Sequence, residues 1–121
     1  MAGTDRKPVL VVDDDRDIRE GLQALLESEG HTVFTASDGQ DALDLLATIP
    51  RPGLVLLDLM MPGMNGHRFI QAARADPALE DLSIVVLTAA PVAVQGVAGL
   101  LRKPPDLDEL LRIVDRFCGA A

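Results

Sequence analysis

The sequence contains no tryptophan and no tyrosine, and aromatic residues make up only 2% of its 121 positions. A hydrophobic core must therefore be built from Leu, Val, Ile and Ala, which are the usual filling of parallel sheets covered by helices on both faces. The one cysteine, Cys118, cannot form an internal disulfide, as is typical of proteins from reducing compartments. We expect Cys118 to be a small buried residue.

Long hydrophobic runs and clusters of basic residues are also missing. No apolar stretch approaches the roughly 20 residues that span a membrane, and nothing resembles a signal peptide. The 19 acidic residues outnumber the 11 basic ones, giving a net charge of −8, which disfavours binding to nucleic acid or to anionic membranes. We therefore expect a cytoplasmic protein with neither of these as a partner.

What the sequence does contain is a regular alternation of short apolar runs and amphipathic stretches. The runs occupy residues 8–12, 32–36, 54–58, 83–87 and 100–103. They are rich in Val, Leu and Ile, the pattern of strands buried on both faces. Strand–helix alternation predicts an α/β fold with a parallel sheet and right-handed crossovers. The length fits one domain over residues 1–121.

Start and stop signals place the helices. An amphipathic stretch after Asp15 ends at Gly30, a common stop residue. Ser37 and Gln40 have the spacing of a capping box, and a third helix is expected to follow Asn65. The last helix begins at Asp106, with Glu109 three residues further on.

The connection between the fourth and fifth runs is unusually short. Residues 15–31 and 37–53 supply comfortable crossovers, whereas residues 89–99 supply only 11 residues. A crossover that includes a helix needs at least about 10–12 residues. We predict that the fourth helix is shortened or missing, with no more than two turns from Pro91.

Polar side chains stand at the carboxyl ends of four runs, where open parallel sheets bind their ligands. Asp13 and Asp14 follow the first run, and Asp58 ends the third. Thr88 follows the fourth run and Lys103 ends the fifth. Each has a commoner explanation by itself, such as a helix cap, a turn residue or a solvated lysine. Their occurrence together at one edge of the sheet favours a binding site.

This arrangement predicts a divalent metal and a phosphoryl group. Two carboxylates at 4 Å repel by about 4 kcal/mol at an effective dielectric constant near 20, and a hard cation relieves that repulsion. A few carboxylates with water suit Mg²⁺. Phosphoryl transfer needs mainly positioning and charge neutralisation, and an aspartate can be the covalent acceptor. Asp58 is the best candidate, because it stands alone at its strand end.

The segments VLVVDDD, LLDLMMPGMNG, LTA and KP, in this order, resemble the receiver domain of two-component response regulators. The resemblance covers nearly the whole chain. It implies a flavodoxin-like, doubly wound sheet of five parallel strands in the order 2-1-3-4-5. It also implies that a histidine kinase or phosphotransfer protein donates phosphate to Asp58, and that the chain catalyses only its own phosphorylation and dephosphorylation.

The resemblance further assigns roles to single residues. Asp14, Asp58 and the backbone carbonyl of Met60 would ligate Mg²⁺, and Asp13 would act mainly through metal-bound water. Thr88 and Lys103 would contact the phosphoryl oxygens, and the Lys103–Pro104 peptide would be cis.

The chain departs from the family between Thr88 and Lys103. Besides the short connection, Leu100 stands where an aromatic switch residue is usual. One interpretation is a harmless deletion in a tolerant surface region. The other is that residues 89–101 and the last helix form a surface for a downstream protein effector or for a homodimer.

Two other functions compete with the receiver hypothesis. A Mg²⁺-dependent phosphohydrolase with an aspartyl nucleophile commonly has a second Asp two residues later, where this chain has Met60. A degenerate receiver would act as a phosphorylation-independent interaction module, but Asp13, Asp14, Asp58, Thr88 and Lys103 are all present.

Overall fold

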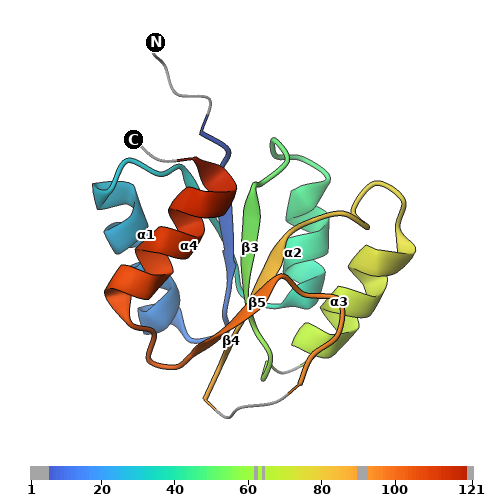
Figure 1. The fold of residues 1–121 in the computed structure, drawn as a ribbon. Coiled ribbons are helices and arrows are strands. Elements are labelled where there is room, and N and C mark those ends of the chain that lie inside the picture. The colour runs from blue at the N-terminus through green and yellow to red at the C-terminus, as the bar shows by residue number, and fades with distance from the viewer. Residues whose placement is uncertain (1–5, 62, 64, 90–92, 120–121) are drawn as a thin grey trace.

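A five-stranded parallel sheet with helices on both faces is formed by the residues that the computed structural model describes, namely 6–61, 63, 65–89 and 93–119 (Figure 1). The strands are β1 (Val9–Val12), β2 (Val33–Ala36), β3 (Leu54–Asp58), β4 (Ile84–Thr88) and β5 (Gly99–Arg102). They pair in the order β2-β1-β3-β4-β5, so the predicted flavodoxin-like α/β fold is confirmed. β3 matches its apolar run, and the other strands differ from theirs by one residue at one or both ends.

Four helices connect or follow the strands: α1 (Arg16–Ser28), α2 (Gly39–Leu46), α3 (Gly66–Ala75) and α4 (Leu107–Cys118). The side chains of Asp15, Asn65 and Asp106 cap α1, α3 and α4, as their positions predicted. The predicted cap at Ser37 is wrong by one residue. Asp38 caps α2 by accepting the backbone N–H of Asp41 at 2.7 Å. Ser37 instead donates its own N–H to the Asp41 carboxylate.

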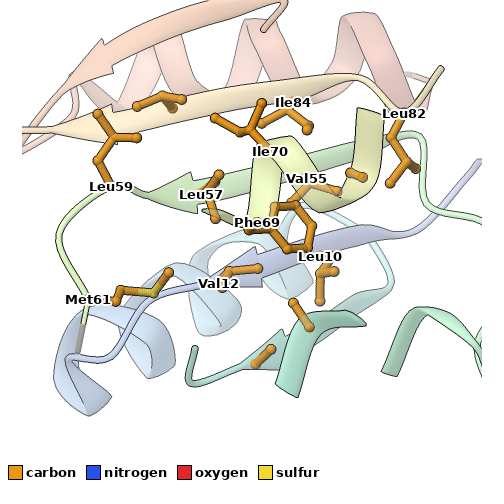
Figure 2. Packing of buried hydrophobic residues seen from close by; sticks show 14 residues of the cluster. Leu10, Val12, Val55, Leu57, Leu59, Met61, Phe69, Ile70, Leu82 and Ile84 are labelled. Carbon is orange, nitrogen blue, oxygen red and sulfur yellow. The ribbon is translucent and has the colours of Figure 1, made fainter. Parts of the chain in front are cut away.

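The sheet separates two layers of core. α1 and α4 cover one face, where Leu26 and Val114 pack against strand residues such as Leu56. α2 and α3 cover the other face, where Phe69 lies over Leu10 and Val55 (Figure 2). Alternate residues of β1 and β3 serve the two layers, which explains why these runs are apolar throughout. Cys118 is 2% exposed, so its predicted burial is confirmed.

The fourth crossover contains no helix within its described residues, 89 and 93–98, in line with a shortened or missing helix; Pro91 lies outside the described residues. Val94 and Val97 pack against the α2–α3 side of the core. Arg74 of α3 holds the connection by donating to the carbonyl oxygen of Gly96. β5 is left partly uncovered, because Leu100, paired with the buried Val86, is 37% exposed.

Candidate active site at the carboxyl edge of the sheet

The carboxyl ends of the strands bring the predicted polar residues to one edge. Asp13 comes directly after β1, Asp58 and Thr88 are the last residues of β3 and β4, and Lys103 comes directly after β5. Asp13, Asp58 and Thr88 are only 0%, 4% and 6% exposed. Burying carboxylates costs several kcal/mol each unless a countercharge is near. The fold therefore tolerates them because charge is compensated at the site.

Lys103 provides that compensation. Its Nζ lies 2.9 Å from Asp13 Oδ2 and 3.3 Å from Asp58 Oδ1. Its backbone N–H donates to the carbonyl oxygen of Thr88 at 2.8 Å, so β4 and β5 together fix where the lysine leaves the sheet. The Lys103–Pro104 peptide is cis, as the resemblance implied.

The pKa values of Asp58 and Lys103 are both raised at this site. Burial raises the pKa of Asp58 above its ordinary value, the charge of Asp13 raises it further, and the Met60 N–H and Lys103 oppose the shift. Burial alone would lower the pKa of Lys103, but Asp13 and Asp58 raise it overall. Because its pKa is raised, the Lys103 ammonium group stays charged beside the two buried carboxylates.

Three carboxylates converge closely enough to hold a metal ion. Asp13, Asp14 and Asp58 each offer an oxygen within 4.8 Å of the others. Asp14 is exposed to solvent. Asp13 Oδ2 is buried, and Lys103 Nζ is its ion-pair partner at 2.9 Å. A carboxylate oxygen can accept more than one partner, so Asp13 Oδ2 can also bind a metal ion or its water. This hard oxygen set fits Mg²⁺.

The loop after Asp58 is held close to the site. The backbone N–H of Met60 donates to Asp58 Oδ1 at 3.2 Å, whereas the Met60 side chain points outward and is 79% exposed. A Cβ at Gly66 would lie 2.8 Å from the Asp58 carbonyl oxygen. Gly66 therefore allows the first turn of α3 to lie against this loop.

Residues outside the predicted set also bear on the structure. Arg19 of α1 donates from Nη1 to the Asp13 carbonyl oxygen at 2.7 Å, a contact that no sequence motif indicated. His31 is buried but lies before β2, at the other end of the strands, and pairs with Asp115 of α4 at 2.9 Å. His31 is therefore not near Asp13, Asp14 or Asp58.

Among the described residues, no helix is both long enough and apolar enough to cross a membrane.

Comparison with known families and proteins agrees with this geometry. The sequence model of the family described as "Response regulator receiver domain" matches residues 9–115. The response regulator MprA of Mycolicibacterium vanbaalenii is 44% identical over 110 residues, covering 85% of this chain and 46% of that protein. MprA of Mycobacterium avium is 43% identical, with 85% and 47% covered. The chain thus spans about half the length of these curated relatives.

Solved structures give the same result over nearly the whole chain. A response regulator receiver protein from Pseudomonas putida superposes with a TM-score of 0.84 at 33% identity, covering 94% of this chain and 99% of that one. The chemotaxis protein CheY4 of Vibrio cholerae superposes with a TM-score of 0.84 at 30% identity, covering 93% and 98%.

Proposed function

This chain belongs to the family of response regulator receiver domains, and on that premise we propose that it accepts a phosphoryl group on Asp58. A histidine kinase or a phosphotransfer protein would be the donor, and the phosphorylated domain would signal by binding a protein partner. The observation that carries this proposal is the convergence of Asp13, Asp14, Asp58 and Lys103 at one edge of the sheet.

The chemical step is a displacement at phosphorus. One carboxylate oxygen of Asp58 attacks the donor's phosphohistidine, an O–P bond forms, and the N–P bond breaks with its electron pair returning to the imidazole. Asp58 Oδ1 is already bound by the Met60 N–H and lies near Lys103. We therefore assign the attack to Oδ2. Attack requires the ionised carboxylate, which the positive charge of Lys103 favours by opposing the rise in the pKa of Asp58.

Mg²⁺, when bound, would neutralise charge on both the carboxylate and the phosphoryl oxygens. The residues that would hold it are Asp13, Asp14 and Asp58, together with the backbone carbonyl of Met60. Asp13 would act mainly through metal-bound water, because its Oδ2 is already ion-paired with Lys103.

Thr88 and Lys103 complete the cradle for the transferred group. Lys103 is the only one of the two that carries charge, and we propose that it pairs with a phosphoryl oxygen. The Thr88 hydroxyl would donate to another, since β4 delivers it to the same edge. Neither residue needs to move a proton, because positioning and charge neutralisation dominate phosphoryl transfer.

The donor has a natural place to dock beside this cradle. A cavity of about 320 Å³ is lined almost entirely by apolar atoms of α1, of the end of β4 and of the turn after β5; its lining residues are Ile18, Leu22, Leu87, Lys103, Pro104 and Pro105. Lys103 belongs to both the cavity and the acidic cluster. An apolar helix surface on the donor protein, packed here, would bring its phosphohistidine towards Asp58.

The output surface is proposed along the edge strand β5 and α4. Leu100 and Leu107 are 37% and 54% exposed, and no helix of the described connection covers β5. We propose that a protein effector or a second copy of the chain binds across residues 93–101 and α4. Hydrogen exchange of residues 93–101 should slow on addition of Mg²⁺ with beryllofluoride and effector. Sedimentation of the isolated chain distinguishes the homodimer from the effector complex.

The phosphoacceptor role is tested by incubating the protein with acetyl phosphate and Mg²⁺ and measuring intact mass. We expect one phosphate adduct, which Asp58→Asn abolishes. Asp44→Asn is the matched control: Asp44 is an exposed aspartate on α2 that accepts a hydrogen bond from Gln40, and asparagine keeps that acceptor. Its adduct should equal that of the wild type.

Absence of any adduct on the wild-type protein, while its fold and Mg²⁺ binding are intact, would overturn the proposal in favour of a degenerate interaction module. An adduct that survives Asp58→Asn would instead relocate the acceptor.

A further inference from the structure

Asp13 is fixed from several directions at once. Its backbone N–H donates to the Ala36 carbonyl oxygen of β2 at 3.1 Å, and its Oδ1 accepts the backbone N–H of Asp15 at 2.9 Å. Its Oδ2 lies 2.9 Å from Lys103 Nζ. Its carbonyl oxygen accepts from Arg19 Nη1 at 2.7 Å. Arg19 is thus the only partner of Asp13 among these that reaches it from inside a helix.

The geometry of α1 explains why Arg19 can reach back. The Asp15 side chain accepts the N–H groups of Asp17 and Ile18, and the Arg19 N–H donates to the Asp15 carbonyl oxygen at 2.9 Å. The first turn of the helix is therefore locked in register with the loop. The Arg19 guanidinium can then bind back to Asp13, the first residue of the acidic run.

Two effects of Arg19 on a bound cation have opposite signs. A guanidinium near a cation site repels the cation, so removing it should strengthen metal binding. A guanidinium that fixes the peptide between Asp13 and Asp14 directs both side chains, so removing it should weaken metal binding. Residues that orient metal ligands typically change affinity by about 10- to 100-fold when lost, whereas repulsion across solvent is small and screened.

We propose that Arg19 is a positioning residue for the acidic site: by holding the Asp13 carbonyl it aims the carboxylates of Asp13 and Asp14 at the divalent ion. This inference rests on the proposed function, because it assigns a role within the same site. It predicts a net loss of metal affinity on removing a positive charge, which simple electrostatics does not.

The test compares Arg19→Met with Arg16→Met. Arg16 lies in the same first turn and has the same charge, but its Nε donates to Glu20 at 2.8 Å on the exposed surface. Mn²⁺ affinity is measured by electron paramagnetic resonance on the full chain, since the absence of tryptophan and tyrosine removes the usual fluorescence signal. We expect Arg19→Met to bind Mn²⁺ about tenfold more weakly. Arg16→Met should bind as tightly as the wild type or slightly more tightly.

A third variant and a second readout separate positioning from general stability. Arg19→Lys retains a charged donor and should recover part of the affinity. Thermal unfolding is followed for each variant, and affinity is measured well below every Tm; a merely structural role would lower Tm and leave the Mn²⁺ affinity unchanged. Unchanged or tighter Mn²⁺ binding by Arg19→Met would overturn the inference.

The failure of this inference is distinguishable from failure of the proposed function. If wild type binds Mn²⁺ and gains a phosphate adduct while Arg19→Met binds equally well, only the role of Arg19 is wrong. If the wild type binds no Mn²⁺ and forms no adduct, both the proposed function and the role of Arg19 are wrong.

Discussion

The ammonium group of Lys103 lies closer to Asp13 than to Asp58, at 2.9 Å from Asp13 Oδ2 against 3.3 Å from Asp58 Oδ1. Asp13 is the more deeply buried of the two acids, so the lysine satisfies the carboxylate that water cannot reach. A metal ion drawn to the same acids must share them with this cation. Lys103 and the metal therefore compete for the carboxylates of Asp13 and Asp58 before phosphorylation, although both would bind a phosphoryl group.

Replacing Lys103 by Gln should separate these two effects. Mg²⁺ affinity should rise about tenfold, equivalent to about 1.4 kcal/mol of removed repulsion, because the carboxylates lose their internal countercharge. Phosphorylation by acetyl phosphate should fall, because the transferred group loses a positive partner. Titration calorimetry and intact mass measure the two quantities.

Arg102→Gln is the control for that experiment. It removes the same charge from the neighbouring position, which is exposed on β5, and both quantities should stay near their wild-type values. Weaker Mg²⁺ binding by Lys103→Gln would show that the lysine organises the acids rather than competing for them.

The Asp58 carboxyl group should lower the free energy of unfolding of the metal-free protein, by an amount that depends on pH. Burial and Asp13 raise its pKa in the folded state above the ordinary value of 3.8. At pH below that ordinary value the carboxyl is protonated in both states and costs nothing. As pH rises towards and through the raised folded pKa, the unfolded state has lost a proton that the folded state retains, so stability falls.

Asp58→Asn should therefore stabilise the metal-free protein at neutral pH, and this gain should shrink as the pH is lowered through the raised folded pKa towards 3.8. Urea unfolding followed by circular dichroism measures this, with Asp44→Asn as the exposed control. Added Mg²⁺ should stabilise wild type more than Asp58→Asn. A variant less stable than wild type at alkaline pH would contradict the expectation.

The strands and the location of the site could be predicted from the sequence, because both follow from the pattern of apolar runs. Buried strands appear as apolar runs, and residues at their carboxyl ends must meet at one edge because the strands are parallel. Strand ends were less certain, since apolar character alone does not show where pairing begins. The capping error at Ser37 arose because Asp38 also has a suitable acceptor, and two adjacent caps can be separated only by backbone geometry.

Contacts that a polar side chain makes outside its own helix or strand could not be predicted. Arg19 binds a carbonyl oxygen in the preceding loop, Arg74 binds one 22 residues away, and His31 pairs with Asp115 across 84 residues. Every residue offers a carbonyl acceptor, so the sequence carries no signal for which one an arginine will find. The contact of Arg74 with Gly96 gives residues 93–98 of the crossover a defined place on α3.

Loss of Arg74 should therefore loosen that crossover. Its Nε donates to Gly96 at 3.0 Å and its Nη1 to Glu80 at 2.7 Å, and hydrogen bonds from charged groups contribute about 1.5–3 kcal/mol each. Arg74→Met should lower the free energy of unfolding by about 2 kcal/mol and speed amide exchange of residues 93–98. Hydrogen exchange with mass spectrometry measures the local effect.

Arg68→Met is the matched control, since Arg68 is an exposed arginine on the same helix. Its exchange pattern over residues 93–98 should equal that of the wild type. Equal exchange in Arg74→Met would mean that Val94 and Val97, packed against the core, hold the crossover without the arginine.

His31 and Asp115 should act as a structural tie between the start of β2 and α4. The His31 side chain is fully buried, and its Nε2 lies 2.9 Å from Asp115 Oδ1. Asp115→Leu leaves a buried imidazole nitrogen without this partner, at a cost of about 1–3 kcal/mol. Asp115→Asn keeps an oxygen at the same place and should cost less.

A double variant, His31→Leu with Asp115→Leu, removes both polar groups and should recover part of the loss. Urea unfolding of the wild type, His31→Leu, Asp115→Leu and the double variant completes a cycle whose coupling term measures the tie. Equal stability of Asp115→Leu and Asp115→Asn would show that solvent satisfies His31 instead.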